Sequence, residues 1–455
     1  MKYIIFLITG SLLLSCNKFL DKPGDPTKIV PKTIADAQML MDKPVSNGCT
    51  YIGADEYYVT NYPWNMYMGY PQNRDYYFNW ITNSTTGMVG KDFWQESYNA
   101  IFHTNVAIEI LNKIPVTEAN RKAWEQAMGC AHFIRAWSYL SIAWQFCNAW
   151  HDERSKTDLG AVLDLESDFL NQLSRSTVAE TYDQILKDAG EAVKYLPLFS
   201  ENPARPCRLA AYGLMTRIYL SMRKYEDALA QCDHYLSDLN ALLDFNNPAE
   251  VNLGSDYPIS WSDNKELIYY NHSVYLSGTG YPLDFLSVAA DTTIYKSFHE
   301  NDLRKKAYFH FNGEYYEFTG SPLLFDACTG IATDEIYISR AECYARQGET
   351  GKAMKDLNDL LVTRWKSGTF IPFTANSKEE ALDIILAERK KELLFRGLRW
   401  MDIKRLNEEG ANISITRKSP DHTITGTLLP GSPRFAMQLP ADLIASFGYK
   451  QNPIE

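Results

Sequence analysis

Glu388 and Glu392 lie four residues apart and are the strongest candidates in this sequence for a catalytic pair. On a helix their carboxylates would share one face, and paired carboxylates act as acid and base in glycoside hydrolysis. Arg389, Arg396 and Arg399 lie close to them in the sequence, however. We therefore interpret the pair as part of a buried, ion-paired structural knot and expect no catalytic role for it.

Other patterns for catalysis are missing or incomplete. The sequence contains no Gly-x-Ser-x-Gly and no His-x-x-x-His, and its eight histidines are scattered. Residues 348–352 (Gly-Glu-Thr-Gly-Lys) resemble a phosphate-binding loop, but Arg346 stands where the first glycine should be and Ala353 replaces the magnesium-binding hydroxyl. We interpret this segment as a turn between two helices, and we expect no enzymatic activity, no metal and no cofactor.

Aromatic residues are concentrated in one segment. Residues 51–80 contain eleven aromatic side chains in thirty positions, and a smaller group surrounds Tyr275 and Tyr281. Aromatic faces stack on sugar rings, and charged groups hydrogen-bond to hydroxyls, so a ligand site is the functional hypothesis. For any single residue the alternative is an aromatic side chain that anchors its loop on the scaffold. The predicted ligand-binding residues are Trp64, Tyr70, Arg74, Trp80, Tyr275 and Tyr281.

Composition excludes one class of function. The formal net charge is -11 and no basic run is present, whereas nucleic-acid binders need a basic face to replace phosphate counterions. Hydrophobic residues make up 45% of the chain, which is enough for a sizeable folded core. The sequence therefore predicts an acidic, folded protein that does not bind nucleic acid.

The first sixteen residues have the features of a bacterial lipoprotein signal. Lys2 precedes an apolar stretch, residues 3–14, that is too short to span a membrane. Leu13-Leu14-Ser15-Cys16 then fits a lipobox, in which the cysteine receives a diacylglyceryl group and the chain is cut just before it. We expect residues 1–15 to be removed and Cys16 to carry a membrane-anchoring lipid. The seven remaining cysteines are scattered, and no disulfide pairing follows from their positions.

Hydrophobic periodicity predicts a mainly α-helical fold. The helical blocks are about 92–148, broken at Pro115, then 177–197, 207–239 and 333–405. Capping-box patterns start helices at Thr177 and Ser377, because a glutamate follows each of them three residues later.

Two of these blocks carry the spacing of a helical repeat. In the last block, small and large residues alternate as in a tetratricopeptide unit, and residues 216–235 repeat the offsets with weaker side chains. The residues of the stronger repeat are Ala341, Tyr344, Gly348, Ala353, Leu357 and Leu360. We expect divergent helix–turn–helix repeats that form a scaffold.

The segments between the blocks differ in composition. Residues 45–92 and 241–332 are rich in Gly, Pro, Asn, Ser and aromatic residues, which is typical of loops and short strands. We expect these segments to be functional loop insertions in a single domain, residues 16–455. A β-hairpin is predicted at 308–316, where Asn312-Gly313 would supply the positive φ angles of a type I′ turn.

Several short motifs follow one another along the chain. They are Phe19-Leu20-Asp21, His132-Phe133-Ile134-Arg135-Ala136, Ala210-Ala211-Tyr212, Asp334-Glu335-Ile336-Tyr337, Glu388-Arg389-Lys390-Lys391-Glu392-Leu393, Gly397-Leu398-Arg399-Trp400 and Gln451-Asn452-Pro453. Each motif is weak alone, but the ordered set resembles the SusD/RagB family of Bacteroidetes surface lipoproteins from end to end. Two departures concern local loops: residues 148–151 replace a Gly-Asp-Val-Pro-like turn, and Arg396 replaces the usual acidic residue before Gly397.

The resemblance implies a place and a partner. Such proteins sit on the outer face of the outer membrane, cap a SusC-like TonB-dependent transporter and deliver a glycan or a peptide to it. Their repeat helices are implied to contact the transporter, and their loops to build the ligand site. The expected function is thus nutrient binding, with a glycan or oligosaccharide as the leading ligand. A peptide-uptake lipoprotein is one alternative; a surface glycan hydrolase or a lectin-like adhesin is another.

Overall fold

The computed structural model describes residues 31–42, 53–61, 64–65, 79–80, 89–168, 173–260, 264–271, 288–321 and 328–455. Helices dominate this part of the chain, and its strands are short and antiparallel. The mainly α-helical fold predicted from the sequence is confirmed. None of the helices in these ranges combines the length and the apolar character that a membrane crossing requires.

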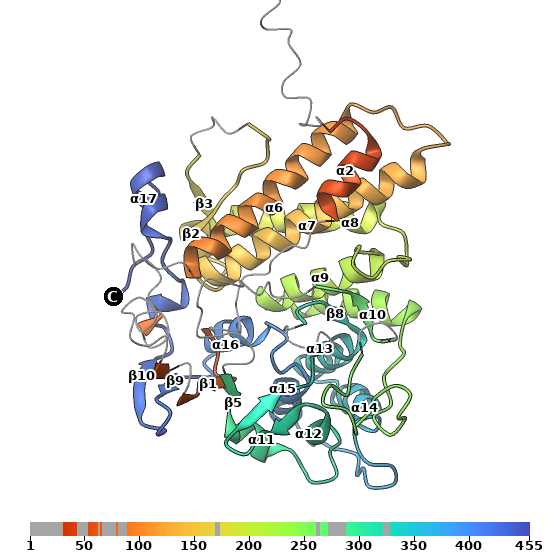
Figure 1. Ribbon diagram of the computed structural model, residues 1–455, viewed down its shortest axis with the longest axis vertical. Helices are drawn as coiled ribbons and strands as arrows, with labels where there is room; N and C mark the ends of the chain where they lie inside the picture. Colours follow the sequence, from red (N-terminus) through yellow and green to blue (C-terminus); the bar gives the residue numbers. More distant parts are fainter. Residues whose placement is uncertain are drawn as a thin grey trace, which may run out of the picture.

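Three long helices form one end of the molecule (Figure 1). They are α6 (Val89–Asn112), α7 (Arg121–Phe146) and α8 (Val178–Tyr195), and α2 (Ile34–Met41) packs against the first two. Helix α7 is the centre of this group, since every residue from 127 to 146 except His132 is buried. His132 and Arg135 both bind Asp188 of α8, at 2.7 Å each, so the polar residues of this motif join the two helices.

The repeat helices follow as packed pairs. They are α9 (Arg208–Ser221) with α10 (Tyr225–Asp238), and α13 (Thr333–Arg346) with α14 (Thr350–Leu361), followed by α15 (Lys378–Glu392) and α16 (Arg399–Asn407). Ala341, Ala353 and Leu357 are fully buried between the helices, as the repeat spacing predicts. Gly348 has a φ of +82°, and Arg223, the equivalent residue of the weaker repeat, has a φ of +59°. The two turns therefore share one left-handed geometry.

The two predicted capping boxes differ in the structure. Thr177 and Glu180 satisfy each other's backbone N–H groups, so the first box is complete. Ser377 accepts the N–H of Glu380, but the Glu380 carboxylate accepts the N–H of Asn376 and not that of Ser377. The second prediction was therefore right about the helix start and wrong about the reciprocal bond.

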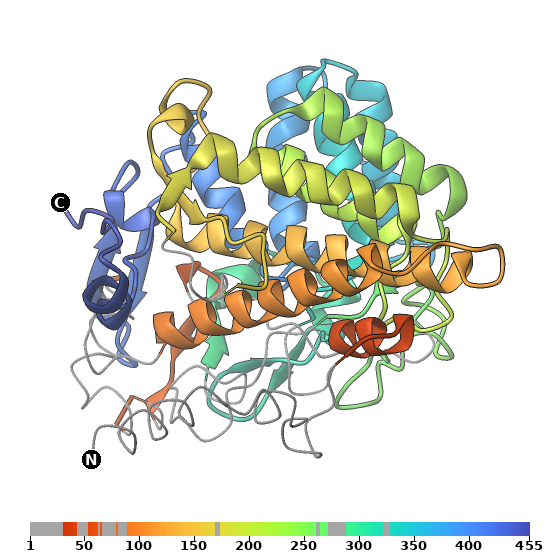
Figure 2. The ribbon, with the colours of Figure 1, turned by 90° about the horizontal axis from the view of Figure 1, so that it is seen from above.

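Short antiparallel strand pairs lie at several places around the helices (Figure 2). The pairs are β1 (Tyr57–Val59) with β5 (Val288–Ala290), β2 (Leu159–Val162) with β3 (Arg175–Thr177), β4 (Leu267–Tyr269) with β8 (Ile331–Ala332), β6 (Phe309–Phe311) with β7 (Tyr316–Phe318), and β9 (Ile415–Lys418) with β10 (Ile424–Leu428). Short helices α11 (Thr292–Ser297), α12 (Arg304–Ala307) and α17 (Ala441–Phe447), and 3-10 turns Arg154–Lys156 and Pro433–Phe435, complete the described elements.

The predicted hairpin is present, but its turn differs from the prediction. Phe311 pairs with Tyr316, which leaves a four-residue loop, 312–315. Of the loop residues only Gly313 has a positive φ, +100°, whereas a type I′ turn needs two. The side-chain oxygen of Asn312 accepts the N–H groups of Glu314 and Tyr315, and these bonds stabilise the longer loop.

Candidate functional site

Residues 53–56, near the start of the aromatic segment 51–80, are bound to the helical scaffold, and we call them the anchor. The Asp55 carboxylate accepts hydrogen bonds from Arg399 of α16 at 2.8 and 3.0 Å. A carboxylate oxygen of Glu56 accepts the backbone N–H of Phe395 at 2.9 Å, just before that helix. Strand β1 starts at the next residue, so the anchor fixes β1 to the helical scaffold.

The two described tryptophans of the segment differ in burial. Trp80 is 2% exposed, its indole N–H donates to the carbonyl of Gly53 at 3.0 Å, and the Arg417 guanidinium lies 4.9 Å from its ring. This geometry favours loop anchoring over ligand contact for Trp80. Trp64 is half-buried and packs on the core edge, which suits either role. Tyr70, Arg74, Tyr275, Tyr281 and Cys16 lie outside the described residues, and their roles stay predictions.

A polar and aromatic cluster surrounds Tyr58 of β1. The Tyr58 ring lies 5.5 Å from the ring of His422, and Asn61 donates to the Glu314 carboxylate at 3.0 Å. Burial, then the charges of Asp291 and Glu314, raise the pKa of Tyr58, so both carboxylates act on its hydroxyl. We call this group the Tyr58 cluster; its members are Tyr58, Asn61, Asp291, Glu314, Tyr315 and His422.

Four separate chain segments supply the Tyr58 cluster. Tyr58 lies opposite Ala289 of β5, and Asp291, directly after β5, is the N-cap of α11. The hairpin loop 312–315 supplies two members, and the β9–β10 turn supplies His422, whose φ is +66°. The aromatic segment and the hairpin were predicted from the sequence, whereas Asp291 and His422 were not. Their only signals in the sequence were turn and cap chemistry, which says nothing about distant partners.

A stack of aromatic rings lies on the same hairpin. Tyr295 of α11 stacks on Tyr316 at 3.7 Å with 20° between the planes, and Phe311 lies 5.0 Å from Tyr316. Phe311 is 53% exposed, so the stack reaches the surface. Flat apolar faces beside hydroxyl, amide and carboxylate groups are the surface chemistry that sugar rings require.

The paired glutamates form the predicted ion-paired knot. Arg304 of α12 binds Glu388 at 2.6 Å and Glu392 at 2.9 Å, and Arg364 binds Glu392 at 2.8 Å. Burial would raise the pKa of Glu388, but Arg304 and Lys391 outweigh it and hold the pKa below its usual value. Arginine side chains hold both carboxylates in ion pairs, so neither is free to act as a catalytic acid.

The partners expected for this knot were wrong. Arg389 binds Asp402 at 2.8 Å, Arg396 binds Asp334 at 3.2 Å, and Arg399 binds the anchor. Consecutive side chains on a helix point about 100° apart, so Arg389 leaves α15 on a different face from Glu388. Arginines from distant segments bind the glutamates instead, and local spacing could not reveal them.

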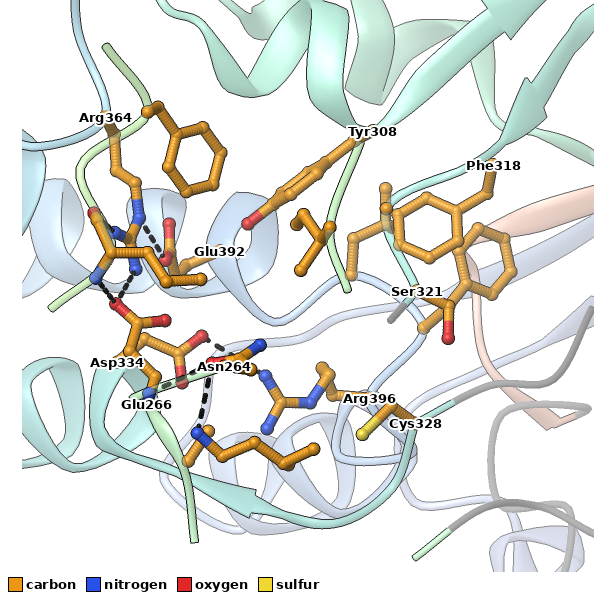
Figure 3. Close-up of a pocket in the computed structure, with 18 residues that line it drawn as sticks. Asn264, Glu266, Tyr308, Phe318, Ser321, Cys328, Asp334, Arg364, Glu392 and Arg396 are labelled. Carbon is orange, nitrogen blue, oxygen red and sulfur yellow. Dashed lines mark hydrogen bonds and ion pairs between the residues drawn. The ribbon is translucent and has the colours of Figure 1, made fainter. Parts of the chain in front are cut away.

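A small cavity lies beside the knot (Figure 3). Glu266, Tyr308, Arg364, Glu392 and Arg396 are among its lining residues, and Tyr308 points its hydroxyl toward Glu392. The cavity offers about 40 Å³ to the centres of water-sized molecules, which is room for about three waters. Burial raises the pKa of Glu266 to about 7 against the opposing charge of Arg364. A sugar ring does not fit, so the cavity belongs to the scaffold.

The described residues contain neither a group of His, Cys, Asp or Glu side chains suited to a metal ion nor a disulfide. The six described cysteines are all buried with free thiols. Burial raises the pKa of Cys130 to about 11 and that of Cys232 to about 12, so these thiols are protonated and unreactive near neutral pH.

Two family models match the chain. The model described as "Starch-binding associating with outer membrane" matches residues 18–220, and the model described as "SusD family" matches residues 333–427. The matched ranges include the buried helix α7, the stronger repeat and the knot glutamates on α15.

Curated relatives are of the same kind. The chain is 22% identical to SusD-like protein P2 of Formosa agariphila over 393 residues, which covers 72% of this chain and 74% of the relative. It is 24% identical to SusD-like protein P38 of the same organism over 401 residues, with 72% and 75% covered.

Solved structures share the fold. A SusD superfamily protein from Bacteroides thetaiotaomicron gives a TM-score of 0.73 at 20% identity, with 92% of this chain and 100% of that chain covered. A putative sugar binding protein from Bacteroides vulgatus gives 0.71 at 19% identity, with 94% and 99% covered. Surface glycan-binding protein A from Bacteroides uniformis gives 0.67 at 17% identity, with 93% and 99% covered. The predicted helical-repeat fold is thus confirmed, and the chain belongs to the SusD/RagB family.

Proposed function

We propose that this protein binds carbohydrate at the outer face of the outer membrane and passes it to a nutrient transporter. The family of the chain supports this proposal, because the family model that matches residues 18–220 is described as "Starch-binding associating with outer membrane". Proteins named as sugar-binding and as surface glycan-binding share its fold.

We propose the Tyr58 cluster and the neighbouring hairpin stack as part of the binding surface. The exposed ring of Phe311 offers a face for stacking, and Asn61 and Glu314 offer a hydrogen-bond donor and acceptor for hydroxyls. The ion pairs of Glu388 and Glu392 support binding without turnover, so an oligosaccharide incubated with the purified protein should be recovered unchanged.

Calorimetry on the full-length protein with a panel of oligosaccharides tests the binding surface. Tyr58→Ala should weaken binding of the saccharide that the unaltered protein binds by about 1–3 kcal/mol, as for a contact residue at a recognition site. Tyr212→Ala is a matched control, because Tyr212 stacks on His234 at 5.1 Å on the repeat helices, away from the cluster. An equal loss of saccharide affinity in Tyr58→Ala and Tyr212→Ala would contradict this binding surface. Binding of peptides but no saccharide would favour the peptide-uptake alternative.

We also propose that Cys16 carries the lipid that holds the protein on the membrane. The lipobox around Cys16 supports this role. Cys16→Ala should move the protein from the outer-membrane fraction to the soluble fraction, whereas Cys49→Ala should leave it in place. If the Cys16→Ala protein stayed in the membrane fraction after a carbonate wash, this result would contradict lipid attachment at Cys16.

The proposed partner is a SusC-like TonB-dependent transporter. Membership of the SusD/RagB family supports it. Affinity purification from membranes solubilised in mild detergent should recover a large barrel protein together with this chain. Repeated recovery of the chain alone, with the lipid anchor intact, would count against a transporter cap.

A further inference from the structure

The Tyr58 cluster contains two acidic groups and no described lysine or arginine. The Asp291 carboxylate accepts the N–H of Thr293 at 2.7 Å, and the Glu314 carboxylate accepts from Asn61 at 3.0 Å. These bonds to neutral donors leave the negative charge in place. Neither carboxylate forms an ion pair within the described chain, in contrast to the glutamates of the knot.

Both charges act on the hydroxyl of Tyr58, which belongs to the proposed binding surface. Glu314 is exposed and Asp291 is half-buried, and each contributes to the raised pKa of the Tyr58 hydroxyl. An anionic group placed against Tyr58 would meet the same repulsion as the phenolate of Tyr58 itself. A hydroxyl, by contrast, can donate a strong hydrogen bond to a carboxylate.

We propose that the Tyr58 cluster selects saccharides without acidic groups and excludes uronates and sulfated sugars. Asp291 and Glu314 are the specificity-determining residues: they accept hydrogen bonds from the hydroxyls of a neutral sugar and repel a carboxylate or sulfate. This inference rests on the proposed carbohydrate-binding function and adds the ligand class. The net charge of -11 acts in the same direction by repelling polyanions at longer range.

The test compares neutral oligosaccharides with their uronic acid counterparts: mannan with mannuronan, galactan with galacturonan, and glucan with glucuronan. Calorimetry on the full-length protein at low salt should show at least about tenfold weaker binding of the acidic member of the pair that binds. The difference should shrink in 0.5 M NaCl, because salt screens exposed charges.

Charge-neutral variants separate repulsion from shape. The double variant Asp291→Asn/Glu314→Gln should reduce several-fold the ratio of the affinity for the neutral saccharide to the affinity for the acidic one. The control is the double variant Glu118→Gln/Glu201→Gln, which removes two exposed carboxylates on distant loops. It changes the net charge by the same amount and should leave the affinity ratio unchanged. Equal or tighter binding of the acidic members, or a ratio unchanged in the Asp291/Glu314 variant, would overturn this inference and leave the proposed function standing. Failure to bind any saccharide would overturn the proposed function as well.

Discussion

The indole N–H of Trp80 donates to the carbonyl oxygen of Gly53 at 3.0 Å, across 27 residues of sequence. The two residues stand near the two ends of the aromatic segment, so this bond holds the ends of the segment together. Gly53 also lies against the face of Trp400, where an added Cβ would come within 2.7 Å of the ring. The segment is thus closed at a point that is packed on α16.

The first prediction concerns Trp80. Trp80→Ala removes a buried side chain and should lower the free energy of unfolding by about 3–5 kcal/mol. Trp80→Phe keeps a ring for Arg417 but removes the N–H donor, and should lower it by only about 1–2 kcal/mol. Urea unfolding measures both variants.

Calorimetry with the saccharide on the folded Trp80 variants distinguishes a role in anchoring the loop from direct contact with the ligand. If Trp80 is only an anchor, Trp80→Phe should bind the saccharide within about threefold of the unaltered protein. A loss of 1–3 kcal/mol in binding by Trp80→Phe, with stability nearly unchanged, would restore the ligand-contact role first predicted for Trp80.

Trp64 gives a second prediction. It is half-buried at the edge of the core, and its backbone N–H donates to Thr60 at 3.0 Å. Trp64→Ala should weaken saccharide binding by about 1–3 kcal/mol and lower the melting temperature less than Trp80→Ala does. Normal binding by Trp64→Ala would place this tryptophan among the loop anchors.

The helical scaffold was predictable because periodicity is a local signal. The spacing that includes Ala341, Ala353 and Leu357 identifies which faces are buried, and the helices do pack on those faces. The Tyr58 cluster was not predictable in the same way. Tyr58 and His422 are more than 350 residues apart, and no local pattern encodes their meeting. The same limit explains why the ion pair between Arg304 and Glu388 was not predicted from the sequence, and why Arg389, which binds Asp402, was expected in its place.

The third prediction concerns the knot. Glu392 has a fully buried carboxylate whose two oxygens accept hydrogen bonds from Arg364 and Arg304. Glu392→Gln takes a negatively charged partner from two buried arginines, Arg304 and Arg364, and should lower the free energy of unfolding by about 3–5 kcal/mol. Glu300→Gln, an exposed change at a nearby position, should lower it by less than about 0.5 kcal/mol. Similar melting temperatures for the two variants would show that the knot contributes little to stability.

The fourth prediction concerns pH. Burial raises the pKa of Glu56 from its ordinary 4.5 to about 7, and the neighbouring Asp55 charge adds to the rise, while the N–H of Phe395 opposes it. Between pH 4.5 and 7 the folded protein therefore binds more protons at this site than the unfolded chain. The stabilising contribution is complete below pH 4.5 and is lost as the pH rises through 7. A shift of this size corresponds to a contribution on the order of 3 kcal/mol.

Glu56→Gln tests this contribution. Glutamine keeps an acceptor for the Phe395 N–H but cannot ionise, so the variant should gain stability relative to the unaltered protein as the pH rises from 4.5 to 8. Glu266, whose pKa is also about 7, titrates in both proteins and cancels in the difference. Urea unfolding at several pH values measures the difference, and parallel stability curves for the two proteins would contradict the role of Glu56.

The fifth prediction uses two glycines of the stronger repeat. Gly348, in the turn, has a φ of +82°, whereas Gly351 lies in the first turn of α14, and an added Cβ would meet no atom within 4 Å at either position. Steric crowding is therefore absent at both, and the backbone conformation decides the outcome. Gly348→Ala should destabilise the protein by about 1–2 kcal/mol, because an L-residue is strained in the left-handed region. Gly351→Ala should be neutral or stabilise by up to about 1 kcal/mol, since alanine favours helix.

The weaker repeat provides an internal check on that reasoning. Arg223 occupies the equivalent left-handed position with a φ of +59°, and its guanidinium donates to the carbonyl of Trp150 at 2.7 Å. Arg223→Gly relieves the backbone strain but removes this hydrogen bond. The free energy of unfolding should therefore change less in Arg223→Gly than in Gly348→Ala. Chemical denaturation of the three variants tests the series. Equal losses for Gly348→Ala and Gly351→Ala would show that helix packing, and not turn geometry, fixes glycine in this repeat.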